Sequence, residues 1–388
     1  MVNTLHLSGT SYDIGFKHGT LARSQIHSCL VNYATYFANA GMSPGDVEDL
    51  AAAFSSTIQK VAPHLHDELR GIADGAKVPL FDIVALNARS EIALAAKPAS
   101  ARLDEDEDED ETEDVPIPPD GCTTFAETTP GGAQWLAQNW DWQTSQLANL
   151  VLLEIETPAE SPARGIRLKT MTEAGLLAKV GFNSEKVGVC LNALRATDLD
   201  THKLPLHVLL RLVLESESVA GARRRIMDEF GGGAACFGHF GVADGIDDGH
   251  AESWEIGPYG IGVIERDQNG RLYHTNHALK EGLQIREVIW LEDTKERLVR
   301  LKELVEASDK KNHVSRLTDT QQKDRIFAFL KDEDNYPNSI CRANDPSQRG
   351  LLGEMQTVFS IVMDLKDAKA WVKVGRPKQM LEEFELEF

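Results

Sequence analysis

A short segment about a third of the way along the chain carries the residues best suited to covalent chemistry. It reads Asp120-Gly121-Cys122-Thr123-Thr124. A lone cysteine is usually a small buried hydrophobe, and Cys29 and Cys190 are expected to be of that kind. Cys122 differs in its context, because the glycine before it lets a nucleophile approach the Gly121 carbonyl without obstruction by a Cβ atom.

Breaking the Gly121–Cys122 bond would change the chemistry of this cysteine. Cys122 would then carry a free α-amino group, whose ordinary pKa is about 7.7–8.0. Such an amine accepts the thiol proton near neutral pH, so that one residue supplies both nucleophile and base. The residues alone leave two interpretations open, a nucleophile exposed by cleavage or an ordinary buried cysteine.

An acidic run lies just before this segment. From Asp104 to Asp114 the chain reads DEDEDEDETED, and these carboxylates supply almost half of the formal net charge of −21. Like charges repel, and the surrounding stretch holds few apolar residues and several prolines. Lys97 to Asp120 is therefore predicted to be a disordered, exposed linker.

The composition excludes several classes of protein. With 388 residues, 42% of them hydrophobic and 26% charged, the chain has the composition of a folded protein of one to three domains. The excess of 61 acidic over 40 basic residues argues against binding to nucleic acids and to anionic membranes. Five scattered cysteines without a CxxC pair predict neither a disulfide framework nor a zinc site.

Features of localisation point to the interior of the cell. The N-terminal residues lack the basic start and continuous apolar stretch of a signal peptide. No apolar stretch is long enough to span a bilayer, so no membrane association is expected. A reducing, cytoplasmic location is predicted.

Periodicity gives the order of elements, with helices first and strands after the linker. Asn269-Gly270 between two strand-like runs, Tyr259–Glu265 and Arg271–Thr275, predicts a β-hairpin. The order of elements predicts a layered α+β sheet protein. Helices are expected from Ser43-Pro44 to Pro63, through Leu65, Leu69 and Ile72, and at Phe81–Leu94, Leu204–Phe230, Glu281–Ser308 and Gln321–Lys331. Strands are expected at Gln134–Trp142, Leu150–Glu156, Ile166–Thr170, Val187–Leu191, Cys236–Ala243, Thr357–Asp364 and Ala370–Val374.

Several motifs together resemble one known family. They are GTSYDIGFKHG (Gly9–Gly19), ALNARSE (Ala85–Glu91), DGCTT (Asp120–Thr124), AQNWDW (Ala137–Trp142), TEAGLLAKVGFNS (Thr172–Ser184), HTNH (His274–His277), DEDNYPNSICRA (Asp332–Ala343) and VGRP (Val374–Pro377). Each motif alone is unspecific, whereas their order and spacing resemble the acyl-coenzyme A:6-aminopenicillanic acid acyltransferases (isopenicillin N acyltransferases). These are N-terminal-nucleophile hydrolases of the choloylglycine-hydrolase-like superfamily. The resemblance implies a four-layer αββα sandwich of two antiparallel sheets.

The resemblance also implies self-processing. Cleavage between Gly121 and Cys122 would expose Cys122 as the nucleophile. The products would be an α chain of residues 1–121 and a β chain of residues 122–388, which remain associated as a heterodimer in one structural domain. Without the cleavage, the chain would be a dormant precursor or a non-catalytic binding protein, and that alternative is kept.

Further residues match the family's site by their motifs. Asp141 in QNWD matches the acid that positions the α-amino group, and Asn276 in HTNH matches the oxyanion-hole asparagine. Arg342 in SICRA matches an active-site arginine, which would lower the thiol pKa and hold a substrate carboxylate. Without the family, these three residues would be taken as a turn cap, a turn residue and half of a surface ion pair. Additional candidates are Asn192, for the oxyanion site, and Thr123 and Thr124, for assisting cleavage or packing in a strand.

The implied reaction passes through a thioester on Cys122. An amine takes the acyl group in transfer, and water takes it in hydrolysis. No metal, flavin or nucleotide cofactor is expected, and a coenzyme A thioester would serve as the small-molecule acyl donor. The alternative activity is an amidase that acts on N-acyl amino acids or peptide-like substrates.

Three departures from the family pattern concern the substrate. The acidic run is a longer and more charged insertion than the family pattern has. The chain ends in Glu385-Leu386-Glu387-Phe388 without a peroxisomal tripeptide, which favours the cytoplasm over the peroxisome. Gly257 stands where the penicillin-forming enzyme has a serine. Together these departures predict a relative with a different acyl substrate.

Overall fold

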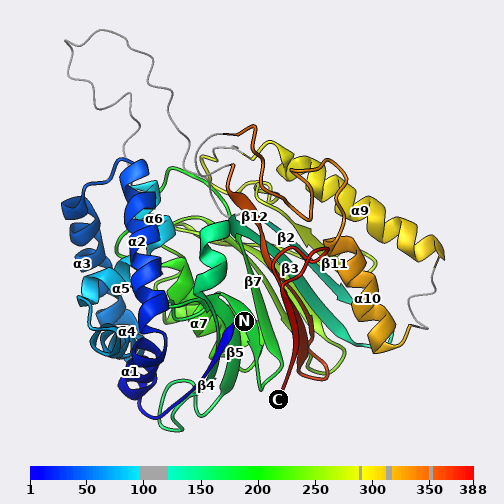
Figure 1. Cartoon of the computed structure of the whole chain (residues 1–388). Coiled ribbons are helices and arrows are strands. Elements are labelled where there is room, and N and C mark those ends of the chain that lie inside the picture. The colour runs from blue at the N-terminus through cyan, green and yellow to red at the C-terminus, as the bar shows by residue number, and fades with distance from the viewer. Residues whose placement is uncertain (96–120, 288–290, 312–316, 349–352) are drawn as a thin grey trace.

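The computed structural model describes residues 1–95, 121–287, 291–311, 317–348 and 353–388. In these residues two β-sheets lie face to face, and helices cover the outer side of each sheet (Figure 1). The predicted α+β class and the four-layer sandwich are therefore confirmed. The predicted linker at residues 97–120 lies outside the described residues.

The larger sheet, called sheet A below, has eight strands. All neighbours in it are antiparallel except β1 and β4, which pair in parallel. In spatial order its strands are β1 (Asn3–Ser8), β4 (Leu150–Glu156), β5 (Arg167–Glu173), β6 (Val180–Asn183), β7 (Val187–Ala193), β8 (Gly238–Asp244), β9 (His250–Gly257) and β10 (Gly260–Ile264).

The smaller sheet, sheet B, has six antiparallel strands. Its strand β3 is buried at every position, as expected for a strand covered on both faces. In spatial order its strands are β11 (Arg271–His274), β2 (Gly121–Thr128), β3 (Gln134–Gln143), β12 (Met355–Asp364), β13 (Lys369–Val374) and β14 (Glu382–Glu387).

Two groups of helices form the outer layers (Figure 1). Sheet A is covered by α1 (Ser11–Leu21), α2 (Arg23–Asn39), α3 (Pro44–Val61), α4 (Pro63–Ala76), α5 (Leu80–Asn87), α6 (Arg89–Leu94), α7 (Leu206–Leu214) and α8 (Val219–Asp228). Sheet B is covered by α9 (Asp293–Lys311) and α10 (Asp319–Leu330). A 3₁₀ helix, η2 (Thr144–Asn149), connects β3 to β4.

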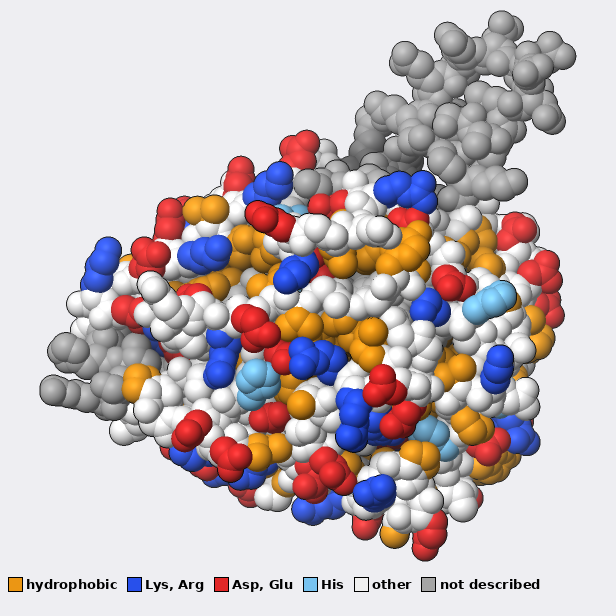
Figure 2. Space-filling model, turned by 180° about the vertical axis from the view of Figure 1, so that it is seen from behind, with side chains coloured by type: hydrophobic (Ala, Val, Ile, Leu, Met, Phe, Trp, Pro, Cys, Tyr) orange, Lys and Arg blue, Asp and Glu red, His pale blue; other side chains and the backbone are white. Residues whose placement is uncertain are grey.

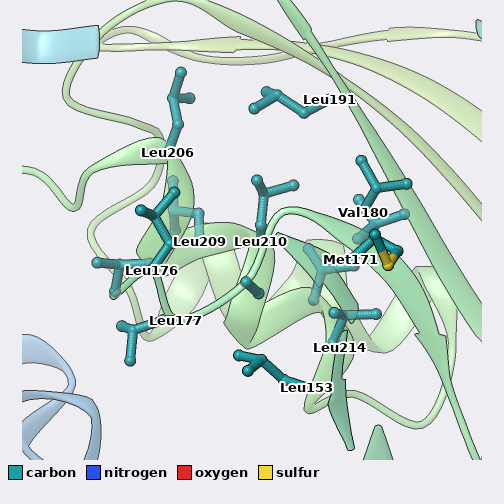
Figure 3. Close-up of a cluster of buried hydrophobic side chains, with 14 of the residues drawn as sticks. Leu153, Met171, Leu176, Leu177, Val180, Leu191, Leu206, Leu209, Leu210 and Leu214 are labelled. Atoms are coloured by element: carbon teal, nitrogen blue, oxygen red, sulfur yellow. The ribbon is translucent and has the colours of Figure 1, made fainter. Parts of the chain in front are cut away.

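Helix α7 anchors the first helical layer to sheet A. Every residue of α7 is buried, and its leucines meet apolar side chains of sheet A (Figure 3). The cluster includes Leu206, Leu209, Leu210 and Leu214 of the helix and Leu153, Met171, Val180 and Leu191 of the sheet. Burying one such side chain contributes about 1.5–3 kcal/mol relative to leaving it in water.

Helices α1 and α4 touch backbone to backbone through glycines. A Cβ atom on Gly15 would lie 2.0 Å from the Glu68 carbonyl oxygen, and one on Gly19 would lie 2.1 Å from that of Ile72. Gly71 on the facing helix leaves equally little room. Gly15 and Gly19 of the motif Gly9–Gly19 are thus explained by close helix packing rather than by chemistry.

The predicted hairpin is wrong. Asn269-Gly270 does form a turn, with Gly270 at φ 76°. However, β10 pairs with β9 in sheet A, whereas β11 pairs with β2 in sheet B. The turn therefore carries the chain from one sheet to the other. β9, β6, β1 and β14 were not predicted, and Gly121–Thr124 of the motif DGCTT forms the start of β2.

Three predicted helices are shorter than expected. Phe81–Leu94 is interrupted at Ala88, and Leu204–Phe230 is divided between α7 and α8. The second break has a local cause, because Ser218 has an extended backbone and its side chain caps α8 by accepting from the Gly221 amide. The predicted helix Glu281–Ser308 begins only at Asp293.

The surface is a mosaic of charges. On the face shown in Figure 2, acidic and basic side chains intermingle, and hydrophobic side chains lie in small groups between them. Among the described ranges, no helix combines the length and apolar character that crossing a bilayer requires.

Candidate active site

Strand β2 places Cys122 between the two sheets. Cys122 pairs with Trp140 of β3, and its side chain is fully buried. Successive residues of a strand face opposite sides, so Cys122 and Thr124 share one face and Thr123 has the other. Cys122 belongs to the core cluster that includes sheet A, whereas Phe125 belongs to the cluster beneath α9 and α10. The side of β2 toward sheet A is called the inner face below, and the side toward α9 the outer face.

Asn276 holds the main chain of the cysteine. The Cys122 amide donates to Asn276 Oδ1 over 2.9 Å, and Asn276 Nδ2 donates to the Ala193 carbonyl over 3.1 Å. These two contacts fix which atom of the amide is oxygen. Asn276 can be near Cys122 because it lies two residues after the end of β11, whose His274 pairs with Thr124 of β2.

Arg297 is a site residue that the sequence reasoning missed. Its Nη1 donates to the Cys122 carbonyl over 2.6 Å and to Thr123 Oγ1 over 3.1 Å, and its Nη2 donates to Asn276 Oδ1 over 2.9 Å. The residue is only 2% exposed. A signal was present in the sequence, because Arg297 lies four and eight residues before the buried Leu301 and Val305 and so belongs to the apolar stripe of α9.

A second group of charges surrounds the residue before the cysteine. Asp141 Oδ2 lies 3.6 Å from Arg342 Nε, and Asp141 Oδ1 accepts from the Thr357 hydroxyl over 2.7 Å. The other end of Arg342 pairs with Asp293, which also accepts from Arg297 Nε over 2.6 Å. Positive and negative side chains thus alternate along the outer face.

The two carboxylates of this group differ in their pKa. Burial raises the pKa of Asp141 above its ordinary value of 3.8, although Arg342 and Arg297 oppose the effect. Burial acts in the same direction on Asp293, but Arg297 and Arg342 outweigh it and lower the pKa of Asp293. Asp293 is therefore the firmly ionised member of the group, and Asp141 is the one that protonates first on acidification.

Gly121 lies directly against the Asp141–Arg342 pair. A Cβ atom on Gly121 would be 3.1 Å from Asp141 Cβ and 3.5 Å from Arg342 Nε. Within the described residues, Asp141 Oδ2 and Arg342 Nε make no hydrogen bond. The Gly121 side of the Gly121–Cys122 bond thus lies against both members of an ion pair, and the Cys122 side contacts Arg297 and Asn276.

On the inner face, a network of hydrogen bonds joins β2 to sheet A. Thr124 Oγ1 donates to Asn192 Oδ1 over 2.6 Å, and His239 Nδ1 approaches the same oxygen to 2.9 Å. Asn192 Nδ2 donates to the His274 carbonyl over 3.3 Å. The two imidazole rings stack with centroids 3.6 Å apart, and His274 Nε2 lies 3.0 Å from Glu255. Burial holds the pKa of His239 well below its ordinary value, so this ring is neutral.

The structure thus brings the predicted residues together on both faces of one strand end. Asn276 contacts Cys122 directly, Asp141 and Arg342 contact Gly121, and Asn192 is reached from the strand through Thr124. The individual catalytic roles stay predictions. A cavity of about 460 Å³ reaches this group from the outer side; it is lined by Leu291, Glu292, Asp293, Glu296, Asn335, Asn338, Arg342 and Gln348.

Gly257, the position of one predicted departure, has no room for a side chain. A Cβ atom there would lie 2.4 Å from the ring of Phe237. A serine at this position would therefore require the Phe237 ring to move.

Comparison with known proteins identifies the family of the chain. The family model described as acyl-coenzyme A:6-aminopenicillanic acid acyl-transferase matches residues 128–379. The 40 kDa form of acyl-coenzyme A:6-aminopenicillanic-acid-acyltransferase from Emericella nidulans is 33% identical over 390 residues, which cover 99% of this chain and 96% of that protein. The chain belongs to this family. The resemblance read from its motifs is confirmed, and the chain is an enzyme of the acyltransferase and amidohydrolase type.

Solved structures with similar architecture are more distant. A variant of conjugated bile acid hydrolase from Clostridium perfringens matches with a TM-score of 0.47 and 13% identity, covering 69% of this chain and 92% of that one. Penicillin V acylase from Agrobacterium tumefaciens matches with a TM-score of 0.43 and 13% identity, covering 69% and 86%.

Proposed function

We propose that the chain cuts itself between Gly121 and Cys122 and then uses Cys122 as an N-terminal nucleophile to transfer or hydrolyse acyl groups. The observation that carries the proposal is the set of contacts around the Gly121–Cys122 peptide bond. Asn276 and Arg297 grip the main chain of Cys122, while Gly121 rests on the Asp141–Arg342 pair. An ordinary buried cysteine in a strand needs no such set of ionic and amide contacts.

The first step is the cleavage of the chain. The Cys122 sulfur attacks the Gly121 carbonyl carbon, the carbon–nitrogen bond breaks, and the nitrogen takes up a proton to become an α-amino group. Water then hydrolyses the thioester, which returns the thiol and leaves a carboxylate on Gly121. The products are chains of residues 1–121 and 122–388. The two chains are proposed to stay together, since β1 and β4 pair across the cut in sheet A.

Asp141 is suited to receive the new amino group. Its Oδ2 faces Gly121 and makes no hydrogen bond among the described residues, so an α-amino group formed there can donate to a charged acceptor. The same contact orients the amine beside the thiol of its own residue. Asp141 is therefore proposed to position the base of the mature enzyme.

Turnover follows the same chemistry with an external carbonyl. The α-amine accepts the thiol proton, the sulfur attacks the acyl carbon, and the leaving group departs with a proton, which leaves a thioester on Cys122. An amine or water then releases the acyl group. Asn276 is proposed to donate from Nδ2 to the oxyanion, a contact whose loss typically costs about 10²–10³ in rate. Asn192 is proposed as a second contributor, with Thr123 and Thr124 orienting the strand.

The family suggests the substrate class. The name of the Emericella nidulans relative indicates an acyl-coenzyme A donor and a 6-aminopenicillanic acid acceptor. We propose a coenzyme A thioester as donor and a small-molecule amine as acceptor, with no metal or organic cofactor. The tight contact between Gly257 and Phe237 favours an acyl group different from that of the penicillin-forming enzyme. The alternative is an amidase of N-acyl amino acids or peptide-like substrates, for which water is the acceptor.

Intact-mass analysis of the purified protein tests the proposal. The wild-type chain of 42.8 kDa should separate under denaturing conditions into two chains cut between Gly121 and Cys122. Cys122→Ala should stay as one chain without turnover, whereas Cys190→Ala, which alters another fully buried cysteine, should process normally.

Product analysis with an acyl-coenzyme A and 6-aminopenicillanic acid then separates the two activities. An N-acylated product identifies a transferase, and free acid alone identifies a hydrolase. Normal turnover by Cys122→Ala, or a wild-type chain that is never cut and never active, would contradict the proposal; the second result would leave the non-catalytic alternative.

A further inference from the structure

The loop that carries Arg342 is folded around the guanidinium group of another arginine. Arg376 follows Gly375 in the loop after β13 and is 8% exposed. Its Nε donates to the Arg342 carbonyl over 3.0 Å, and its Nη2 lies 3.5 Å from the Cys341 carbonyl. Arg376 therefore contacts the main chain of the active-site segment rather than its side chains.

The same guanidinium group also binds the start of that loop. Arg376 Nη2 pairs with Glu333, and Nη1 donates to Gln379 over 3.3 Å. Glu333 is eight residues from Cys341 in sequence, so one side chain closes the loop between them. The loop is further tied by the Cys341 amide, which donates to the Asp332 carbonyl over 2.8 Å.

The clamped main chain is coupled to the ionic group on the outer face. The Arg342 carbonyl accepts from the Thr357 amide over 3.2 Å as well as from Arg376, and the Thr357 hydroxyl donates to Asp141. The Arg342 side chain is aimed from this fixed backbone at Asp141 and Asp293, with Asn338 accepting from its Nη1 over 2.7 Å. Both the origin and the direction of the Arg342 side chain are thus set.

We propose that Arg376 is a positioning residue that holds the Cys341–Arg342 main chain so that the Arg342 guanidinium stays beside Asp141. The inference rests on the proposed function and deepens it. It gives a role to the motif VGRP and to the start of DEDNYPNSICRA, neither of which contributes a group that touches the Gly121–Cys122 bond. The two motifs meet at the Arg376–Glu333 pair.

A planar guanidinium group is needed for this task. It presents donors in a fixed fork and can bind two carbonyls and a carboxylate at once, whereas a lysine ammonium is a point charge on a flexible stem. Displacement of a catalytic group by about 1 Å can cost about 10²-fold in rate, even when the substitution is far from the chemistry. Arg376→Lys is therefore expected to behave more like Arg376→Ala than like the wild type.

Movement of Arg342 has a signature beyond a loss of rate. Asp141 faces Arg342, Arg297, Asp293, Thr357 and Cys341, and the positive charge of Arg342 is the largest influence that opposes the effect of burial. When that charge moves away, the pKa of Asp141 rises further. The acid limb of the pH–rate profile should then move to higher pH.

The experiment compares Arg376→Ala and Arg376→Lys with Lys378→Ala. Lys378 is exposed and pairs with the same Glu333 carboxylate, so its replacement is a matched control that leaves every contact of Arg376 in place. Both Arg376 variants should cut themselves more slowly and lose about 10- to 100-fold in kcat, with little change in KM. Their acid limb should move up by about one pH unit. Added guanidinium should restore part of the activity of Arg376→Ala, and Lys378→Ala should match the wild type.

Two outcomes separate the clamp from the proposed function. If the wild type cuts itself and Arg376→Ala keeps its kcat and pH profile, the clamp is wrong and the function stands. If the wild type never cuts itself, the proposed function fails, and the clamp is judged by hydrogen exchange in residues 338–343. Faster exchange in Arg376→Ala than in Lys378→Ala supports the clamp, and equal exchange overturns it. Should Arg376→Ala not fold, Glu333→Gln is measured in the same way, with a smaller effect in the same direction.

Discussion

Charged side chains are placed differently on the inner and outer faces of strand β2. On the outer face, charged side chains touch the main chain of Cys122, as Arg297 does at the Cys122 carbonyl. On the inner face, where the thiol lies, neutral side chains separate the charged side chains from Cys122. Lys179 Nζ lies 3.7 Å from the centre of the Trp140 ring, and Trp140 is the strand partner of Cys122.

The difference teaches how the main chain of a buried cysteine can be bound by ions while its side chain lies on a different face. On the outer face each ion has a neighbour of opposite sign, as Asp293 has between Arg297 and Arg342, so that attraction offsets the cost of leaving water. These ions act on Cys122 through its backbone, because Arg297 donates to the Cys122 carbonyl. The inner face of the strand carries neutral groups such as Thr124, whose hydroxyl donates to Asn192.

The largest effect is expected at Asn276, which contacts Arg297 on the outer face and the Ala193 carbonyl of sheet A. Asn276→Asp keeps an oxygen that can accept from the Cys122 amide and from Arg297, but it removes the amide donor. If that donor stabilises the oxyanion, kcat should fall about 10²–10³-fold while KM changes little. Steady-state kinetics on the mature enzyme decide this point. A rise in KM with kcat preserved would instead limit the role of Asn276 to holding the Cys122 main chain.

The next effect tests whether the outer face acts through the backbone. Arg297→Gln removes the charge at the Cys122 carbonyl and leaves Asp293 with one arginine instead of two. Self-cleavage and kcat should both fall, by about 10- to 100-fold, because the strand end loses its anchor. Lys302→Gln, an exposed change on the same helix, is the control and should leave both unchanged. Equal rates for the two variants would show that the grip of Arg297 is only structural.

Much of this arrangement was accessible from the sequence. Where the local chemistry is strong, the prediction holds: Ser43 caps a helix that begins at Pro44, and the buried strands β3 and β7 lie close to where their apolar patterns placed them. Cys122, Asp141 and Arg342 were found from their motifs and lie together in space. These features depend on residues near one another in the chain or on a family pattern.

The missing parts depend on contacts between distant segments. Nothing local to Asn269-Gly270 shows that β11 pairs with β2, more than a hundred residues away, instead of with β10. β14 reads EEFELE, and only the partner strand β13 makes this charged segment a strand. Arg297 was not predicted, because α9 contains several other basic residues and only apolar residues mark the buried face of a helix in the sequence.

The pH dependence of the enzyme should separate the two carboxylates of the outer face. Asp141 has a raised pKa, so on acidification it loses its charge, and with it the proposed contact with the α-amino group, while Asp293 is still ionised. The contribution of Asp293 to stability is present above its ordinary value of 3.8 and is lost only as pH falls through its lowered pKa. Activity should therefore decline at a higher pH than the local fold, and it should return on neutralisation.

A pH–rate profile measured beside tryptophan fluorescence, which reports on Trp140 and its neighbours, checks this order. Activity and fluorescence that fall together would assign the acid limb to unfolding instead of to Asp141. Asp141→Asn should remove the part of the acid limb that Asp141 causes, because the new side chain does not titrate, and should leave the part caused by the α-amino group.

The smallest effects come from two neighbouring threonines that sit on opposite faces. Thr124→Val removes a neutral hydrogen bond to Asn192, whose oxygen keeps its contact with His239, and should cost about 0.5–1.5 kcal/mol of the free energy of unfolding. Thr123→Val removes an acceptor of the buried Arg297 guanidinium and should cost more, about 1.5–3 kcal/mol. Denaturant titration of both variants, made in the uncut Cys122→Ala background, measures the pair without interference from processing. Equal costs, or a larger cost for Thr124→Val, would show that the outer face does not hold the strand more strongly than the inner face. The expected order would show that the ionic contacts of the outer face contribute more to holding Cys122 in place.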